Sequence, residues 1–167
     1  WFRLIEQDWA QIKHWQQWAA SRSANNPQSA QLCVAFATEG HEYVSIRQRT
    51  TDRLGWYRQA LAAAEANGDA TRARRLLYHV GSTAYQVGNY EEAEQYAKRL
   101  LEIGRQSKDR LSLGDGWFIT GNLHSHRTEL DAAESAFRKA VQYFESCHAE
   151  MMVGHAVQGI ARIMLFR

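Results

Sequence analysis

The chain has 167 residues, of which 45% are hydrophobic and 11% are aromatic. This composition excludes intrinsic disorder as the main state, and the length suffices for a buried core. The formal net charge of +2 provides no strong field for attracting nucleic acid or an anionic membrane. Partners must therefore be recognised by a specific surface. A single proline and the lack of sustained β-branched runs favour helices throughout.

The two cysteines, Cys33 and Cys147, lie far apart and lack the paired spacing of a zinc site or a disulfide framework. No run of about 18 apolar residues and no signal-peptide pattern occurs. We therefore expect a cytoplasmic chain with no membrane span, no metal and no cofactor. Because it begins at Trp1 and not at a methionine, the chain is interpreted as a fragment of a larger protein.

Residues 1–25 are predicted to form an amphipathic helix ahead of the rest of the chain. Apolar residues recur there at near-helical spacing, namely Trp1, Ile5, Trp9, Ile12 and Trp15. With Trp18, the segment holds more tryptophan than one small helix needs to bury. It is therefore also a candidate for self-association.

From residue 26 to residue 167 the sequence repeats with a period of about 40 residues, which is typical of helical repeat arrays. One period connects positions of the same small or bulky apolar character: Leu77 with Trp117, Gly81 with Gly121, Tyr90 with Leu130, Ala93 with Ala133, Ala97 with Phe137, and Leu101 with Val141. Copies begin near residues 34, 74 and 114, and a half copy begins near residue 154. Because the apolar positions within a copy are three or four residues apart, each full copy is predicted to be a pair of helices.

The turn inside each copy is clearest in the stretch GNYEEA, which begins at Gly88. Gly88 can adopt the left-handed conformation that ends a helix. Asn89 can cap the next helix, with Glu92 completing a capping box three residues later. In the third copy, Thr128 and Asp131 are predicted to make a similar but poorer helix start.

The connections between copies also contain capping residues. Asp69 and Asp109 are predicted to cap the helices that follow them. Before the first copy, Asn26 is predicted to be a cap, with Pro27 at the first helical position. Together with the N-terminal helix, these signals predict about eight helices.

These residues resemble the tetratricopeptide repeat, a helix-turn-helix unit that stacks into an array. Gly81 and Gly121 match the close-packing position of that family, and Leu77 and Trp117 match its first bulky position. The second-helix core is matched by Ala93, Ala133, Phe137 and Ala140. The resemblance implies an all-α fold, a right-handed superhelical array of antiparallel helix pairs that forms an α-solenoid and binds proteins.

A shorter segment, LIEQDWAQIKHWQQWAAS, is similar to part of the bacterial signal-transduction ATPases with numerous domains, the STAND or NB-ARC type regulators. There it joins the nucleotide-switch region to a C-terminal repeat array. No GxxxxGK phosphate loop occurs in this chain, so any ATPase module would lie outside it.

No residue pattern specifies catalysis. His124 and His126 are two apart and point to different faces of a helix, which makes a poor metal pair. Gly114, Gly116 and Gly121 are better explained by close helix packing than by a nucleotide loop, since no strand precedes them. Cys147 beside His148 lacks an orienting third group. We therefore predict that the chain is not an enzyme.

The first helix of each pair lines the concave side of such an array, and its residues outside the packing positions form the candidate partner-binding groove. They are Arg75, Tyr78, Ser82, Tyr85, Gln86, Asp115, Phe118, Asn122, Ser125, His126, His155, Gln158 and Arg162. Tyr78 and Phe118 lie one period apart and are interpreted either as binding anchors or as packing residues. Only Asn122 and Arg75 match the carboxylate clamp of chaperone-binding repeats, so that specificity is not predicted.

Two functions remain open at this stage. One is a non-enzymatic scaffold that binds a protein or peptide in the groove, as the sensor or interaction region of a larger bacterial signalling or transcriptional regulator. The alternative is a structural, autoinhibitory or self-associating spacer with no ligand of its own. Neither involves the membrane or direct nucleic-acid binding.

Overall fold

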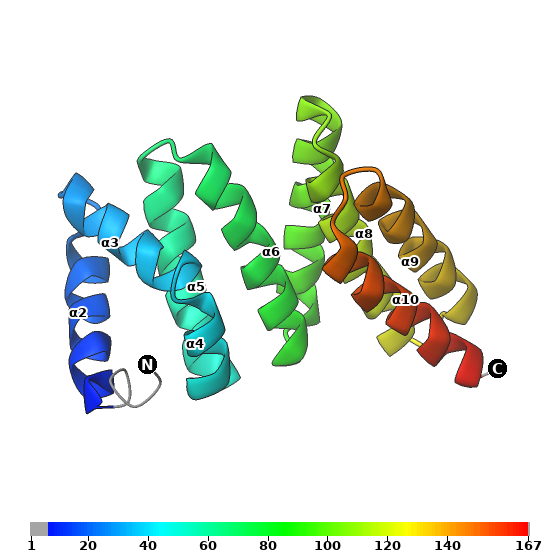
Figure 1. Ribbon diagram of the computed structural model, residues 1–167, viewed down its shortest axis with the longest axis horizontal. Helices are drawn as coiled ribbons and strands as arrows, with labels where there is room; N and C mark the ends of the chain where they lie inside the picture. Colours follow the sequence, from blue (N-terminus) through cyan, green and yellow to red (C-terminus); the bar gives the residue numbers. More distant parts are fainter. Residues whose placement is uncertain (1–6, 167) are drawn as a thin grey trace. The chain divides into compact units, whose positions relative to one another are not determined.

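The computed structural model describes residues 7–166 of the chain, which form helices and no strand (Figure 1). This confirms the predicted all-α class. The helices described are α2 (Trp9–Arg22), α3 (Pro27–Thr38), α4 (His41–Arg47), α5 (Thr50–Ala66), α6 (Ala70–Gln86), α7 (Tyr90–Ser107), α8 (Arg110–His126), α9 (Leu130–Glu145) and α10 (Glu150–Leu165).

Within the described residues there are nine helices, one more than the sequence predicts, because the first helix of the first copy is interrupted at Gly40. The chain divides into two compact units, Trp1–Leu76 and Leu77–Arg167, and α6 contributes residues to both. None of the described helices is both long enough and apolar enough to span a bilayer.

In the N-terminal unit, α2 packs on α3, and α3 packs on α5. Aromatic rings join these helices to α4. The ring centroid of Trp9 lies 5.3 Å from that of Tyr43 and 5.9 Å from that of Trp56. The rings of Phe36 and Trp56 make an edge-to-face contact. Trp9 therefore lies on the apolar face of α2, as predicted, and packs this helix against α4 and α5. Trp1 and Ile5 lie outside the described residues.

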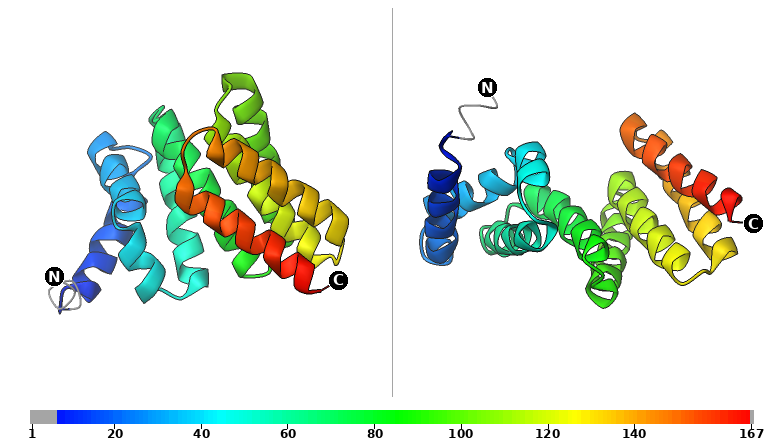
Figure 2. Two further views of the ribbon diagram at one scale, coloured as in Figure 1. Left: turned by 45° about the vertical axis from the view of Figure 1, so that its right-hand side comes forward. Right: turned by 90° about the horizontal axis from the view of Figure 1, so that it is seen from below.

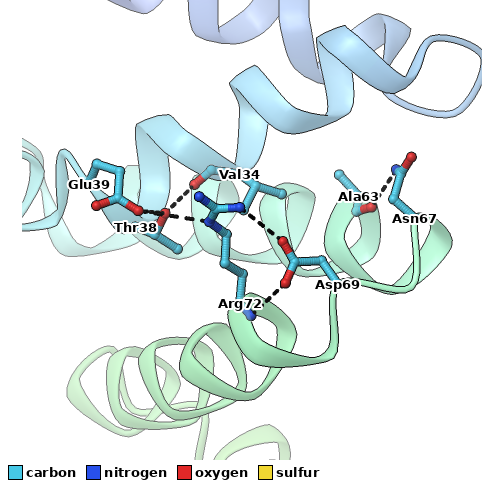
Figure 3. Close-up of polar contacts among 7 residues, drawn as sticks. All are labelled: Val34, Thr38, Glu39, Ala63, Asn67, Asp69 and Arg72. Atoms are coloured by element: carbon cyan, nitrogen blue, oxygen red, sulfur yellow. Dashed lines mark hydrogen bonds and ion pairs between the residues drawn. The ribbon is translucent and has the colours of Figure 1, made fainter.

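The start of α6 is fixed to the end of α3 by polar contacts (Figure 3). Asp69 accepts hydrogen bonds from the backbone N–H of Arg72 at 3.0 Å and from its guanidinium at 3.1 Å. This confirms the predicted cap, and these bonds hold the pKa of the Asp69 carboxyl below its ordinary value. Nε of Arg72 also lies 3.8 Å from Oε1 of Glu39, which accepts from Thr38.

The caps predicted at Asn26 and Asp109 are confirmed as well. The side chain of Asn26 accepts from the backbone N–H of Ser29, and Pro27 is the first residue of α3. Asp109 accepts from the backbone N–H of Leu111 at the start of α8. Each cap satisfies a backbone donor that the helix itself cannot pair.

In the C-terminal unit, α8 packs between α7 and α9, and α10 packs on α9 with smaller contacts to α8 (Figure 2). Two phenylalanines of α9 are fully buried at the centres of its core clusters. Phe137 lies with Ala133 and Ile163, and Phe144 lies with Ala140 and Ala156.

The sequence period is also visible in the backbone. The residues of positive φ recur at that spacing in both kinds of turn. Between pairs they are Gly68, Lys108 and His148, with φ of 68°, 57° and 57°, and within pairs they are Gly88 and Thr128, with φ of 82° and 61°. The predicted left-handed conformation of Gly88 is thereby confirmed.

The turn at Gly88 differs in one respect from the predicted capping box. Asn89 caps α7 by accepting from the backbone N–H of Glu92 at 3.3 Å, as predicted. The Glu92 carboxylate, however, accepts from the side-chain Nδ2 of Asn89 at 2.8 Å. The backbone N–H of Asn89 donates to the carbonyl of Ala84 at 2.9 Å. It is occupied because the preceding helix ends in a Schellman motif.

Thr128 corrects the prediction for the third copy. The residue before α9 is Glu129, which makes no side-chain cap, and Asp131 lies inside the first turn. Thr128 instead occupies the left-handed position that Gly88 holds one period earlier. The backbone N–H of Glu129 bonds to the carbonyl of His124, so the helix-ending motif is retained without glycine.

We expect Thr128→Gly to raise the free energy of unfolding by about 1 kcal/mol, because a β-branched residue is strained at positive φ and glycine is not. The reverse change in the preceding copy, Gly88→Thr, should lower it by a similar amount. Urea unfolding followed by circular dichroism measures both. A destabilised Thr128→Gly variant would show that the threonine side chain contributes more than its backbone strain costs.

Candidate protein-binding surface

The groove residues of α6 and α8 meet at Tyr78 and Asp115. The hydroxyl of Tyr78 is hydrogen-bonded to Ser82 one turn further along α6. Asp115 is only 4% exposed. Burial and the nearby Asp115 carboxylate both raise the pKa of the Tyr78 hydroxyl, and the Ser82 bond opposes them. Tyr78 is therefore partly buried, bonded within α6 and near Asp115 of α8.

Phe118, one period after Tyr78, also contacts neighbouring helices. Its ring lies 5.9 Å from Phe137 of α9 and 6.5 Å from His155 of α10. Phe118 therefore packs on α9 and α10, while Tyr78 and Phe118 both keep a partly exposed surface. Substituting either one would disturb the unit as well as any partner contact.

A more accessible group of side chains lies at the ends of α6 and α8. We call it the tyrosine–arginine cluster, which consists of Tyr85, Tyr90, Asn122, His126 and Arg162. The rings of Tyr85 and Tyr90 lie 5.7 Å apart, and His126 stacks on Tyr90 with ring centres 3.9 Å apart. A guanidinium nitrogen of Arg162 donates to Oδ1 of Asn122 at 3.3 Å.

The charge of Arg162 acts on Tyr85 in this cluster. Burial raises the pKa of the Tyr85 hydroxyl, the Arg162 guanidinium opposes that rise, and Tyr90 adds to it. Since His126 and Arg162 are exposed, the cluster presents a positive group and flat rings to solvent. Such a combination recognises carboxylates and aromatic or aliphatic side chains of a partner protein.

The remaining predicted groove residues fall into two sets. Gln86, His155 and Gln158 are exposed on the C-terminal unit, on α6 and α10, whereas Ser125 is partly buried on α8. Arg75 belongs to the N-terminal unit, where its charge acts on Tyr57. Burial raises the pKa of Tyr57 to about 12, and Arg53 and Arg75 both oppose that rise.

Tyr90 was not among the sequence-predicted site residues. The period places it in the same column as Leu130, so an interior role was the natural expectation. It lies at the start of α7, where its ring is partly buried and stacks against His126 of the next helix pair. A signal for Tyr90 was present in the sequence. It is an aromatic residue that follows the predicted groove residue Tyr85 directly after the Gly88 turn.

Burial raises the pKa of the Cys33 thiol to about 11, so the reactive thiolate is disfavoured. The two histidines diverge, since His124 pairs with Glu129 and His126 stacks on Tyr90. Within residues 7–166, no three or more side chains of His, Cys, Asp or Glu converge on a common metal position.

A family model of the tetratricopeptide repeat matches residues 75–106. The chain contains a tetratricopeptide repeat. The match covers most of α6 and α7, with the Gly88 turn between them, and therefore includes Tyr78, Ser82, Tyr85 and Tyr90. The helix pair after the match follows the same period in sequence and in the conformation of its inner turn, where Thr128 takes the place of Gly88.

The chain is also similar to a curated bacterial protein named regulatory protein AfsR, from Streptomyces griseus. The two are 30% identical over 118 residues, which is 71% of this chain. The same alignment covers 12% of the relative, so the chain spans about an eighth of that protein's length.

Proposed function

We propose that this chain is the protein-binding region of a larger bacterial signalling or transcriptional regulator, and that it binds a protein or peptide through the tyrosine–arginine cluster. The observation that carries the proposal is the cluster itself, in which rings and an arginine from α6, α7, α8 and α10 converge. The repeat gives the general role, because such arrays bind partners along the first helices of their pairs. The similarity to a regulatory protein gives the context.

The partner contact is expected to involve exposed residues beside the cluster. Gln86 of α6 and His155 and Gln158 of α10 add exposed hydrogen-bonding groups. Tyr78 and Phe118 are partly buried, and the ring of Phe118 packs against Phe137 of α9. A peptide with an acidic residue next to an aromatic or aliphatic one fits this combination of an arginine with tyrosine rings.

A structural or self-associating role is the second candidate. It is favoured by large apolar side chains that are exposed among the described residues. Trp15 of α2 is 44% exposed, and α10 exposes Met151, Val157 and Met164, followed by Leu165 and Phe166 at its end. Exposed apolar groups on this scale mark surfaces that contact another chain.

A peptide library displayed on phage and selected against the chain tests the first candidate. We expect selected peptides to lose at least tenfold in affinity for Arg162→Glu, because the substitution reverses the charge of the arginine in the cluster. Isothermal titration measures the loss. The matched control is Arg105→Glu, the same change on an exposed residue of α7, which should alter affinity less than twofold.

Equal losses in the two variants would contradict the cluster as the binding site. If no peptide is selected and light scattering shows a dimer that Trp15→Gln makes monomeric, the self-association candidate is supported instead. Trp15 is suited to that test because it is exposed, whereas Trp9 belongs to the aromatic contacts that hold α2.

A further inference from the structure

A polar cavity of about 640 Å³ lies in the N-terminal unit between α2, the α4–α5 turn and α5. Its volume falls within the range of small-molecule sites, roughly 300–1,000 Å³. None of its lining residues belongs to the tyrosine–arginine cluster. Residues of three kinds line it: the amides Gln16, Gln17, Gln48 and Gln59, the indoles of Trp9 and Trp56, and the charged groups Lys13, Arg49 and Asp52, with Gly55 among them.

Two of the amides present unpaired acceptors. Gln16 is 1% exposed, and its Nε2 donates to Oε1 of Gln59 at 3.0 Å. The other end of the same amide, Oε1 of Gln16, has no hydrogen-bond partner among the described residues. Oε1 of Gln48 is likewise buried and has no described partner. Buried acceptors without donors are destabilising, and native proteins rarely keep them without a reason.

The charged groups of the lining are exposed and partly neutralise one another. Nε of Arg49 lies 3.3 Å from Oδ2 of Asp52, and both side chains are more than half exposed. Lys13 is also exposed. The buried part of the lining is therefore neutral and consists of amides and indoles. A charged ligand would find no buried charge of opposite sign among the described lining residues, because Lys13, Arg49 and Asp52 are all exposed.

Gly55 leaves space on the α5 side of the cavity. A Cβ built at Gly55 has no described side-chain atom or neighbouring backbone within 4 Å. The lining also contains Trp56, next to Gly55 on α5, and Trp9 of α2, whose ring centroids lie 5.9 Å apart with planes tilted by 33°. Indole rings and amides in one lining provide an apolar surface and hydrogen-bonding groups together.

We propose that this cavity binds a small neutral ligand rich in hydroxyl groups, of the saccharide or polyol class. A hydroxyl donates one hydrogen bond and accepts two, so neighbouring hydroxyls can donate to Gln16 and Gln48 and accept from the amide nitrogens of the lining. The C–H face of a sugar ring packs on the indoles, whose faces carry negative potential. This site is independent of the proposed partner surface.

The test uses the chain with glucose, trehalose and myo-inositol as probes and follows the indole and glutamine side-chain signals by NMR titration. We expect saturable shifts of Trp9, Trp56 and the Gln16 amide with at least one probe. Lysine, glutamate and inorganic phosphate are titrated in the same way as charged probes for comparison. Saturation by a charged probe but by none of the three polyols would overturn the proposal, as would no saturation at all.

Gly55→Leu is the decisive variant. The added side chain enters the cavity without meeting a described atom at Cβ, so the helix should fold and the affinity should fall at least tenfold. Gly154→Leu is the matched control, because it makes the same change at another glycine with open space, on α10 outside the cavity. Unchanged affinity in Gly55→Leu would refute the site.

A second variant keeps the test valid if leucine at position 55 prevents folding. Gln16→Met removes the buried unpaired oxygen at similar size and leaves Gln59, which is exposed, to water. We expect affinity for the probe to fall at least tenfold while the thermal midpoint of the ligand-free chain stays equal or rises. A lower midpoint together with unchanged affinity would mean that Gln16 has only a structural role.

Discussion

Replacing Phe137 with alanine is expected to lower the free energy of unfolding by about 3–5 kcal/mol. The ring is fully buried, and three helices of the C-terminal unit converge on it. It packs beside Ala133 on its own helix α9 and against Ile163 of α10, with Phe118 of α8 next to it. An effect of this size is a large fraction of the stability of a typical domain.

The cavity left by this substitution would close poorly. Gly121 and Gly159 approach the ring so closely that a Cβ on either would lie 2.7–2.9 Å from its atoms. These glycines have no side chains that could move into the vacated space, so the lost contacts are not replaced. The backbones of α8 and α10 are therefore both spaced from α9 by the ring of Phe137.

Urea unfolding of Phe137→Ala, followed by circular dichroism, measures the loss. Phe166→Ala is the matched control, because Phe166 is 73% exposed and its removal should change stability by less than about 0.5 kcal/mol. If Phe137→Ala cost less than about 1 kcal/mol, the packing of α8, α9 and α10 around this ring would be contradicted.

The helix pairs of the C-terminal unit were predictable because one sequence column corresponds to one packing contact. Gly81 and Gly121 show this directly. A Cβ on Gly81 would lie 2.9 Å from Ile119, and one on Gly121 would lie 2.7 Å from Phe137. The close-packing role predicted for both glycines is confirmed. Helix periodicity was sufficient there, since each contact joins neighbouring helices at a fixed sequence distance.

The first copy was less predictable because its turn does not follow the period. Gln48 lies one period before Gly88, but its φ and ψ of −90° and 144° are extended rather than left-handed. The break between α3 and α4 depends on Gly40, where a Cβ would lie 2.7 Å from the carbonyl oxygen of Phe36. Such a requirement of close backbone approach has no signature in hydrophobic periodicity.

The candidate surface was predictable only in part. Asn122 and Arg162 are one period apart on first helices, so their contact across α8 and α10 follows from the repeat. The exposure of each groove residue depends on neighbouring side chains, which is why Asp115 is buried and His126 is exposed. The contact of Gln16 with Gln59 joins the N-terminal helix, which lies outside the period, to the first copy, so it could not be derived from the period.

Gly114 and Gly154 occupy the same position in successive copies, yet alanine is expected to have opposite effects at the two sites. At Gly154 a Cβ would meet no described atom within 4 Å outside the local backbone. Gly154→Ala should therefore raise the free energy of unfolding by about 0.5–1 kcal/mol, because alanine loses less backbone entropy in a helix. At Gly114 a Cβ would lie 2.5 Å from Cε1 of Phe144.

Gly114→Ala should lower the free energy of unfolding by about 1–3 kcal/mol, because the ring of Phe144 cannot move away without disturbing a filled core. That ring is fully buried between Ala140 and Ala156. Chemical denaturation of both variants at matched conditions measures the difference in sign. If both variants were stabilised, the ring would have shifted at little cost, and the tight contact between α8 and α9 would not be a constraint. If only Gly154→Ala is stabilised, glycine at this position is required by the phenylalanine of the next helix and not by the turn before it.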